Sequence, residues 1–98
     1  MKEISSAELK QLINEKADFE LIDVREEEEV EEMNINGKHI PMGEVLERMA
    51  EIPRDKKVVV HCRSGKRSAS VIQALERQGY DNLYNLRGGI LAWFAENE

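Results

Sequence analysis

The sequence carries a single cysteine, Cys62, at the end of an apolar run and before a loop rich in basic residues. The segment 58–70 reads VVVHCRSGKRSAS, and Arg63, Lys66 and Arg67 stand where a helix is predicted to begin. Basic side chains in the first turn of a helix oppose its dipole, which costs up to about 1 kcal/mol each. A bound anion would reverse the sign of that interaction. The segment therefore predicts a loop that holds a thiolate, a persulfide or an oxyanion substrate.

Gly65, in the middle of this loop, can adopt backbone conformations that other residues avoid, so the loop can turn its N–H groups inward. Such donors, together with the positive end of a helix, stabilise a thiolate and lower the pKa of a cysteine. The opposite interpretation is that Cys62 is a small, inert core residue, as cysteines at the ends of buried strands usually are. The composition of the loop favours a nucleophile.

The two histidines are not expected to take part in the chemistry. His61 is adjacent to Cys62, but strand side chains alternate between faces, so it should point away from the cysteine. His39 is expected only to cap or pack. One cysteine and two histidines make a zinc site improbable, and neither a metal nor a cofactor is expected. A lone cysteine also forms no internal disulfide, which fits a reducing compartment and predicts a cytoplasmic protein.

Composition and charge limit the class of protein. The 98 residues are 41% hydrophobic and 35% charged, which indicates a globular protein with one domain spanning 1–98. The net charge is −6, and the six acidic residues in the segment 26–32 account for it, because the other 14 acidic residues balance 14 basic ones. Residues 54–68 hold six basic residues and one acid, so the field around Cys62 should be positive.

The same composition argues against two classes of partner. The chain is acidic overall and its five aromatic residues are not interleaved with the basic ones, which disfavours nucleic-acid binding. No apolar stretch approaches the roughly 20 residues that a membrane helix needs, so no membrane association is expected. The acidic segment 26–32 is interpreted as a solvated helix face, with a partner contact as the alternative.

Apolar patterning predicts strands that alternate with helices along the whole chain. The run KVVVHC is continuously β-branched, as in a strand covered on both faces. Ser5 and Glu8 form a capping-box pattern, and Gly79 is expected to close a later helix as its C′ residue. The order predicts an α/β fold, with about five parallel strands in one sheet and about five helices on both faces. Strands are expected at 2–4, 19–24, 38–41, 57–62 and 83–86, and helices at 5–16, 25–34, 42–52, 66–79 and 89–98, the last anchored by Leu91, Trp93 and Phe94.

Three segments, in this order, are similar to motifs of the rhodanese family of sulfurtransferases. LIDVRE at 21–26 resembles a D-V-R motif at a strand end, and VVVHCRSGKRS at 58–68 resembles the catalytic-loop motif C-R-x-G-x-R-S. NLRGGILAW at 85–93 resembles the C-terminal G-G-x-x-x-W motif. Each motif alone is moderately specific, whereas the ordered set is highly specific. The resemblance implies a rhodanese-like fold over nearly the whole chain.

The resemblance also implies a mechanism. The Cys62 thiolate would attack the sulfane sulfur of a small anionic donor such as thiosulfate and release sulfite. The sulfur would remain as a Cys62 persulfide until a thiol, cyanide or another nucleophile accepts it. The loop amides would cradle the persulfide, while the loop side chains would attract the donor and donate a further hydrogen bond. These substrate-binding positions are Arg63, Ser64, Gly65, Lys66, Arg67 and Ser68.

The other two motifs are interpreted as structural. Asp23 and Arg25 of the D-V-R motif are expected to support the active face of the sheet. Gly88, Gly89 and Trp93 are expected to be turn and core residues. We assign a family role only to those residues of this sequence that match the family motifs.

Two other functions would use the same cysteine. One is a carrier module that accepts persulfide sulfur and delivers it to one protein partner. The other is a phosphatase or arsenate reductase, but phosphatases on a similar sheet carry C-x5-R, whereas Arg67 gives the shorter C-x4-R here. The compact segment NINGKHIPMGEV resembles rhodanese domains fused to adenylyltransferases, which implies a sulfur-carrier protein or a cysteine desulfurase as a partner.

Overall fold

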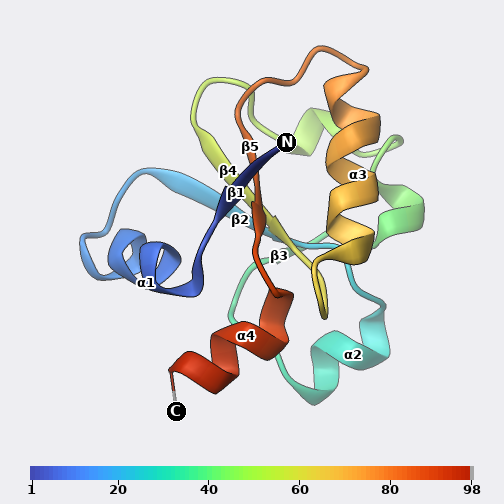
Figure 1. Cartoon of the computed structure of the whole chain (residues 1–98). Coiled ribbons are helices and arrows are strands. Elements are labelled where there is room, and N and C mark those ends of the chain that lie inside the picture. Colours follow the sequence, from blue (N-terminus) through green and yellow to red (C-terminus); the bar gives the residue numbers. More distant parts are fainter. Residues whose placement is uncertain (98) are drawn as a thin grey trace.

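The computed structural model describes residues 1–97, which form a sheet of five parallel strands flanked by helices (Figure 1). The strand order is β1-β5-β4-β2-β3, so β4 lies at the centre and every neighbouring pair is parallel. The strands are β1 (Lys2–Ile4), β2 (Phe19–Asp23), β3 (Lys38–His39), β4 (Lys57–His61) and β5 (Leu83–Leu86).

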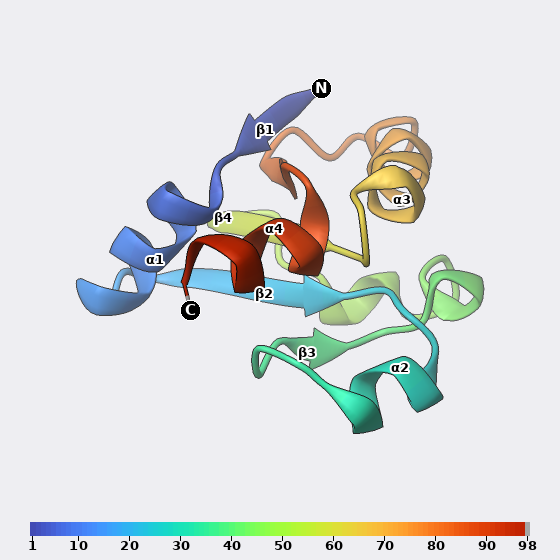
Figure 2. The same cartoon turned by 60° about the horizontal axis from the view of Figure 1, so that its bottom comes forward.

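Helices cover both faces of this sheet, as Figure 2 shows. On one face, α3 and the segment that follows β3 pack on a core that includes Val58, Val60 and Cys62. On the other face, α1 and α4 pack on Val59 and its neighbours. The helices are α1 (Ser6–Asn14), α2 (Glu27–Glu32), α3 (Lys66–Glu76) and α4 (Gly89–Glu96).

The alternation of β4 between these two cores explains its sequence. Val58, Val59 and Val60 are all at most 1% exposed, because successive side chains of the strand point alternately into the two apolar cores. The register pairs Asp23 at the end of β2 with His61 at the end of β4. Since all strands are parallel, the loops that follow β2, β4 and β5 leave the sheet at the same edge, where the three sequence motifs meet.

Two of the expected helix ends are confirmed. The Ser5 hydroxyl accepts the Glu8 N–H at 3.1 Å and the Glu8 carboxylate accepts the Ser5 N–H at 2.9 Å, which completes the capping box. After α3, Gly79 donates to the Glu76 carbonyl and Tyr80 to the Leu75 carbonyl, with Gly79 at a φ of +92°. That pair of bonds is the Schellman pattern with Gly79 in the left-handed position.

The helix expected over 42–52 is wrong. Two short 3-10 helices, η1 (Met42–Glu44) and η2 (Met49–Glu51), stand there instead. The Tyr80 hydroxyl lies 3.1 Å from the Met49 carbonyl and 2.9 Å from the Ile52 carbonyl, so a residue far away in the sequence holds the end of this segment. The structure therefore has four α-helices within residues 1–97, not five.

The last helix also differs in its anchor. Leu91 is 48% exposed, whereas Ile90 is buried at 3%, so Ile90 takes the place expected for Leu91. Trp93 packs on the core as expected. The helix was expected to run to 98, but position 98 lies outside the described residues. None of the helices within residues 1–97 combines the length and the apolar composition that a membrane-spanning helix needs.

Candidate active site

Cys62 directly follows β4 and is 1% exposed. Its Sγ accepts hydrogen bonds from the backbone N–H of Gly65 at 3.2 Å and of Ser68 at 3.4 Å. The Ser68 hydroxyl, itself buried, lies 3.4 Å from the same sulfur. The loop thus closes around Cys62 and places backbone and side-chain donors against its sulfur, as the sequence predicted.

These donors decide the ionisation of the cysteine. Burial disfavours a thiolate and on its own raises the pKa of Cys62. The hydrogen bonds from the Ser68 hydroxyl and from the N–H groups of Ser68, Gly65 and Ser64 more than offset that effect. The net result is a Cys62 pKa below its ordinary value, which suits a nucleophile.

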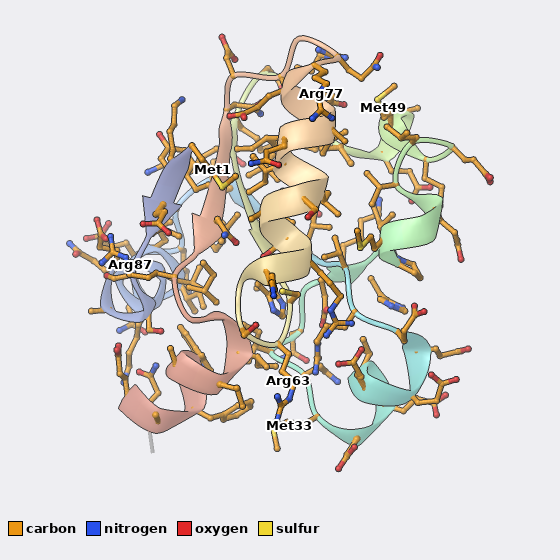
Figure 3. All side chains as sticks on the ribbon, turned by 45° about the vertical axis from the view of Figure 1, so that its right-hand side comes forward. Met1, Met33, Met49, Arg63, Arg77 and Arg87 are labelled. Atoms are coloured by element: carbon orange, nitrogen blue, oxygen red, sulfur yellow. The ribbon has the colours of Figure 1, made fainter. Side chains whose placement is uncertain are left out.

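The shape of the loop depends on Gly65, which has a φ of +103° immediately before α3. A side chain would be strained in that conformation, whereas glycine adopts it readily. On either side of Gly65, Arg63, Ser64 and Lys66 are exposed, and Figure 3 shows Arg63 extending away from the sheet on the side of Met33. The basic side chains of Arg63 and Lys66 therefore face solvent and give this end of the sheet a local positive charge.

Arg67 has a partner that the sequence did not reveal. Its guanidinium donates to both carboxylate oxygens of Glu29 in α2, at 2.7 and 2.9 Å. The hydrogen bond from Arg67 lowers the pKa of Glu29 to about 2. Part of the acidic segment 26–32 therefore braces the basic loop, and Arg67 contributes less positive charge to an incoming anion than Arg63 or Lys66.

Asp23 and Arg25 form a buried ion pair at the end of β2. The Arg25 Nη2 lies 2.8 Å from Asp23 Oδ2, and the two side chains are 4% and 1% exposed. The same guanidinium donates to the carbonyls of Met33 at 2.7 Å and Glu29 at 3.4 Å. Arg25 thereby fixes α2, which in turn positions the Glu29 carboxylate beside Arg67 of the cysteine loop.

His61 lies on the opposite face of β4 from Cys62, as the alternation of side chains predicted. It is fully buried, and its Nε2 is 3.6 Å from Asp23 Oδ2. Burial lowers the pKa of His61, while the Asp23 carboxylate opposes that effect. Within residues 1–97, Cys62 Sγ accepts hydrogen bonds from Gly65 and Ser68, whereas the His61 Nδ1 lies 3.5 Å from the Cys62 carbonyl oxygen, so the structure shows no Cys–His couple.

The Gly-Gly turn before α4 fastens the other side of the loop. The N–H groups of Ile90 and Leu91 donate to the carbonyls of Cys62 and Arg63, at 2.9 and 3.1 Å. A Cβ on Gly89 would lie only 2.3 Å from the Arg63 carbonyl oxygen. These two bonds hold the backbone of Cys62 and Arg63 against the start of α4. The sequence motif includes Gly89, but the close approach of the Arg63 backbone, which requires a glycine there, is visible only in the structure.

A hollow of about 230 Å³ borders the loop at Arg63. Its walls combine charged and apolar side chains, including Arg25, Glu29, Met33, Arg63 and Leu91. Within residues 1–97, no group of three or more His, Cys, Asp or Glu residues could hold a metal ion.

Comparisons with known proteins identify the family of this chain. The model of the rhodanese-like domain matches residues 5–96. The chain belongs to the rhodanese-like family. Its sequence is 42% identical over 94 residues to a sulfurtransferase of Allochromatium vinosum, which covers 95% of this chain and 88% of that protein. It is 36% identical over 97 residues to the thiosulfate sulfurtransferase GlpE of Coxiella burnetii, covering 98% and 90% of the two chains.

A solved rhodanese-related protein from Thermoplasma volcanium has the same fold. It superposes with a TM-score of 0.87 at 34% identity, covering 99% of this chain and 94% of that one. The rhodanese-like fold expected from the sequence is therefore confirmed, and the relatives of this chain include sulfurtransferases.

Proposed function

We propose that this rhodanese-like domain is a sulfurtransferase that moves sulfane sulfur from a thiosulfate-type donor to a thiophilic acceptor through a Cys62 persulfide. The observation that carries the proposal is the set of donors on the cysteine sulfur, from Gly65 and Ser68. A sulfur atom that receives N–H donors and lies at the start of a helix is stabilised as an anion. Both the thiolate and the persulfide of the reaction are such anions.

In the first half-reaction, the Cys62 thiolate attacks the outer sulfur of thiosulfate. A bond forms between Sγ and that sulfur, and the bond between the two sulfurs of thiosulfate breaks. The electron pair of the broken bond leaves with sulfite, so thiolate and thiosulfate become persulfide and sulfite with no change in total charge. The loop amides hold the terminal sulfur of the persulfide, while Arg63 and Lys66 draw the dianionic donor toward the loop.

In the second half-reaction, cyanide or a thiolate attacks the terminal sulfur of the persulfide. The new bond forms to the acceptor, and the electron pair of the persulfide bond returns to Cys62 as a thiolate. The products are thiocyanate or an acceptor persulfide. A cysteine that cycles between thiolate and persulfide needs reducing surroundings, so we place this reaction in the cytoplasm.

The loop favours sulfur over phosphate as its cargo. Three donors already lie within 3.4 Å of Sγ, and Arg67, the residue that would complete a phosphate loop, is paired with Glu29. A persulfide adds one atom to the cysteine, whereas a phosphate needs room and donors for three equatorial oxygens. We therefore propose sulfur transfer rather than phosphate or arsenate chemistry.

The proposal is tested by measuring thiocyanate formation from thiosulfate and cyanide. The expected result is ping-pong kinetics, because the sulfur stays on the protein between the two substrates. Cys62→Ser removes the activity. The matched control is Ser70→Ala, an exposed α3 hydroxyl whose loss leaves the rate unchanged.

Two results would contradict the proposal. Kinetics that require both substrates on the protein at once would exclude a persulfide intermediate. A chain that thiosulfate does not load but a cysteine desulfurase does would be a sulfur carrier serving one protein partner.

A further inference from the structure

Asn85 occupies an unusual position for its type. It lies in β5 beside the central strand, is 5% exposed, and pairs in register with Val60. Asparagine is disfavoured inside strands, and a buried side-chain amide is tolerated only when its hydrogen bonds are made. The reason for this residue must therefore lie in its partners.

Both partners of the Asn85 amide belong to the cysteine loop. Oδ1 accepts the Ser68 hydroxyl at 2.6 Å, and Nδ2 donates to the Gly65 carbonyl at 3.0 Å. Gly65 and Ser68 both donate their N–H groups to Cys62 Sγ, at 3.2 and 3.4 Å. The Asn85 side chain thus links Gly65 and Ser68, which both donate to the sulfur.

The Ser68 hydroxyl has one proton and two acceptors within reach. Asn85 Oδ1 is at 2.6 Å and Cys62 Sγ is at 3.4 Å, so the short bond goes to the amide. A protonated Cys62 can then donate its own S–H to Ser68 Oγ. Once the thiol ionises it donates nothing, and the Ser68 proton is drawn from the amide toward the negative sulfur.

We propose that Asn85 is a positioning residue for sulfur transfer, which fixes Gly65 at the cysteine and competes with Cys62 for the Ser68 proton. This inference rests on the proposed function only for its importance to turnover. The hydrogen bonds of Asn85, Ser68, Gly65 and Cys62 themselves do not involve a sulfur donor. Asn85 acts through Ser68 and Gly65 and does not touch the substrate.

The test is a double-mutant cycle between Asn85→Leu and Ser68→Ala, with the pKa of Cys62 as the readout. The chain has one cysteine, so thiolate absorbance in the ultraviolet, corrected with a Cys62→Ser background, reports that group alone. Arg67 stays in every variant, so its charge cancels from the cycle. The titration needs no sulfur donor, so its outcome is independent of whether thiosulfate is the substrate.

Competition for one proton predicts coupling of a definite sign. Removing the amide frees the Ser68 proton for the thiolate, whereas in Ser68→Ala there is no proton to free. Asn85→Leu should therefore lower the pKa of Cys62 more, or raise it less, when Ser68 is present than when residue 68 is alanine. The difference between the two backgrounds should be about half a pKa unit or more. Equal changes in both backgrounds, or coupling of the opposite sign, would overturn the proposal.

Two further variants keep the result interpretable if Asn85→Leu does not fold. Asn85→Ser is smaller and cannot span both partners, and it should show the same sign of coupling. Asn82→Ser is the matched control, because its amide also braces backbone carbonyls, those of Pro53 and Lys56, but at a distance from the sulfur. It should lower stability and leave the pKa of Cys62 unchanged, and a shift in Asn82→Ser equal to that in Asn85→Ser would refute the role of Asn85.

Discussion

The contact between Gly89 and the cysteine loop leads to a prediction of definite size. A Cβ at this position would lie 2.3 Å from the carbonyl oxygen of Arg63, 2.5 Å from its carbonyl carbon and 2.7 Å from the carbonyl oxygen of Cys62. All three atoms are backbone, so no flexible side chain can swing aside. Gly89 also has a φ of +60°, which L-residues rarely adopt. Gly89→Ala must therefore move α4 away from the loop.

The cost of this substitution has two parts. The left-handed conformation costs a non-glycine residue about 1–2 kcal/mol. The overlap with the loop backbone adds about 1–3 kcal/mol, as overpacking usually does. Together they give a loss of about 2–5 kcal/mol, against a total stability of about 5–15 kcal/mol for a domain of ordinary stability. The variant should fold, but the bonds from Ile90 and Leu91 to the loop carbonyls should lengthen or break.

Urea unfolding and persulfide loading measure the two consequences. Gly79→Ala is the control for backbone conformation alone, since its φ is +92° and the nearest atom to a new Cβ is the end of the Arg54 side chain at 3.5 Å. Gly43→Ala is the control for substitution as such, because nothing lies within 4 Å of a Cβ there. Gly89→Ala should lose more stability than Gly79→Ala and should also load sulfur more slowly. Equal losses in these two variants, with loading unchanged, would refute the idea that α4 shapes the loop.

Three other substitutions test separate parts of the site. Glu29→Gln weakens the pair with Arg67, whose side chains are about one-third exposed, so the stability loss stays below about 1 kcal/mol. Because the folded-state pKa of Glu29 is lowered from 4.5 to about 2, that loss is fully present above pH about 4.5 and disappears as the pH falls toward about 2; a loss independent of pH contradicts this. Asp23→Asn leaves a buried guanidinium without its counter-charge and should cost about 3–5 kcal/mol, whereas Asp18→Asn at an exposed pair costs at most about 1 kcal/mol; similar urea midpoints for the two would argue against it. Arg63→Ala should raise the KM for thiosulfate about fivefold at low salt and change stability by less than about 0.5 kcal/mol. The effect on KM should disappear as the salt concentration increases. A KM equal to that of the parent protein at low salt would show that Arg63 does not attract the sulfur donor.

Much of the fold could be read from local patterns. The β-branched run of β4, the Ser5 capping box and the Gly79 helix end are decided by residues close together in the sequence, and each was predicted correctly. The segment 42–52 was not, because its apolar spacing suits a helix while a hydroxyl from Tyr80 engages two of its carbonyls. A contact between residues so far apart leaves no periodic signal.

The site was predicted in the same uneven way. The unusual charges at the start of α3 indicated an anion site, and the loop around Cys62 has the expected donors. The partner of Arg67 was missed, since Glu29 is 38 positions away and is one of six acids in its segment. Asn85 could have been noticed as a polar residue at an inward-facing position of a strand. Its two hydrogen bonds depend on how β5 and α3 pack, which the sequence does not state.

The most direct measurement is the intact mass of the chain after treatment with thiosulfate labelled isotopically at its outer sulfur. Attack by Cys62 on that atom predicts a species one labelled sulfur heavier, which cyanide returns to the starting mass and which Cys62→Ser never forms. An unchanged mass, or an adduct that retains the sulfonate group of the donor, would contradict transfer through a Cys62 persulfide.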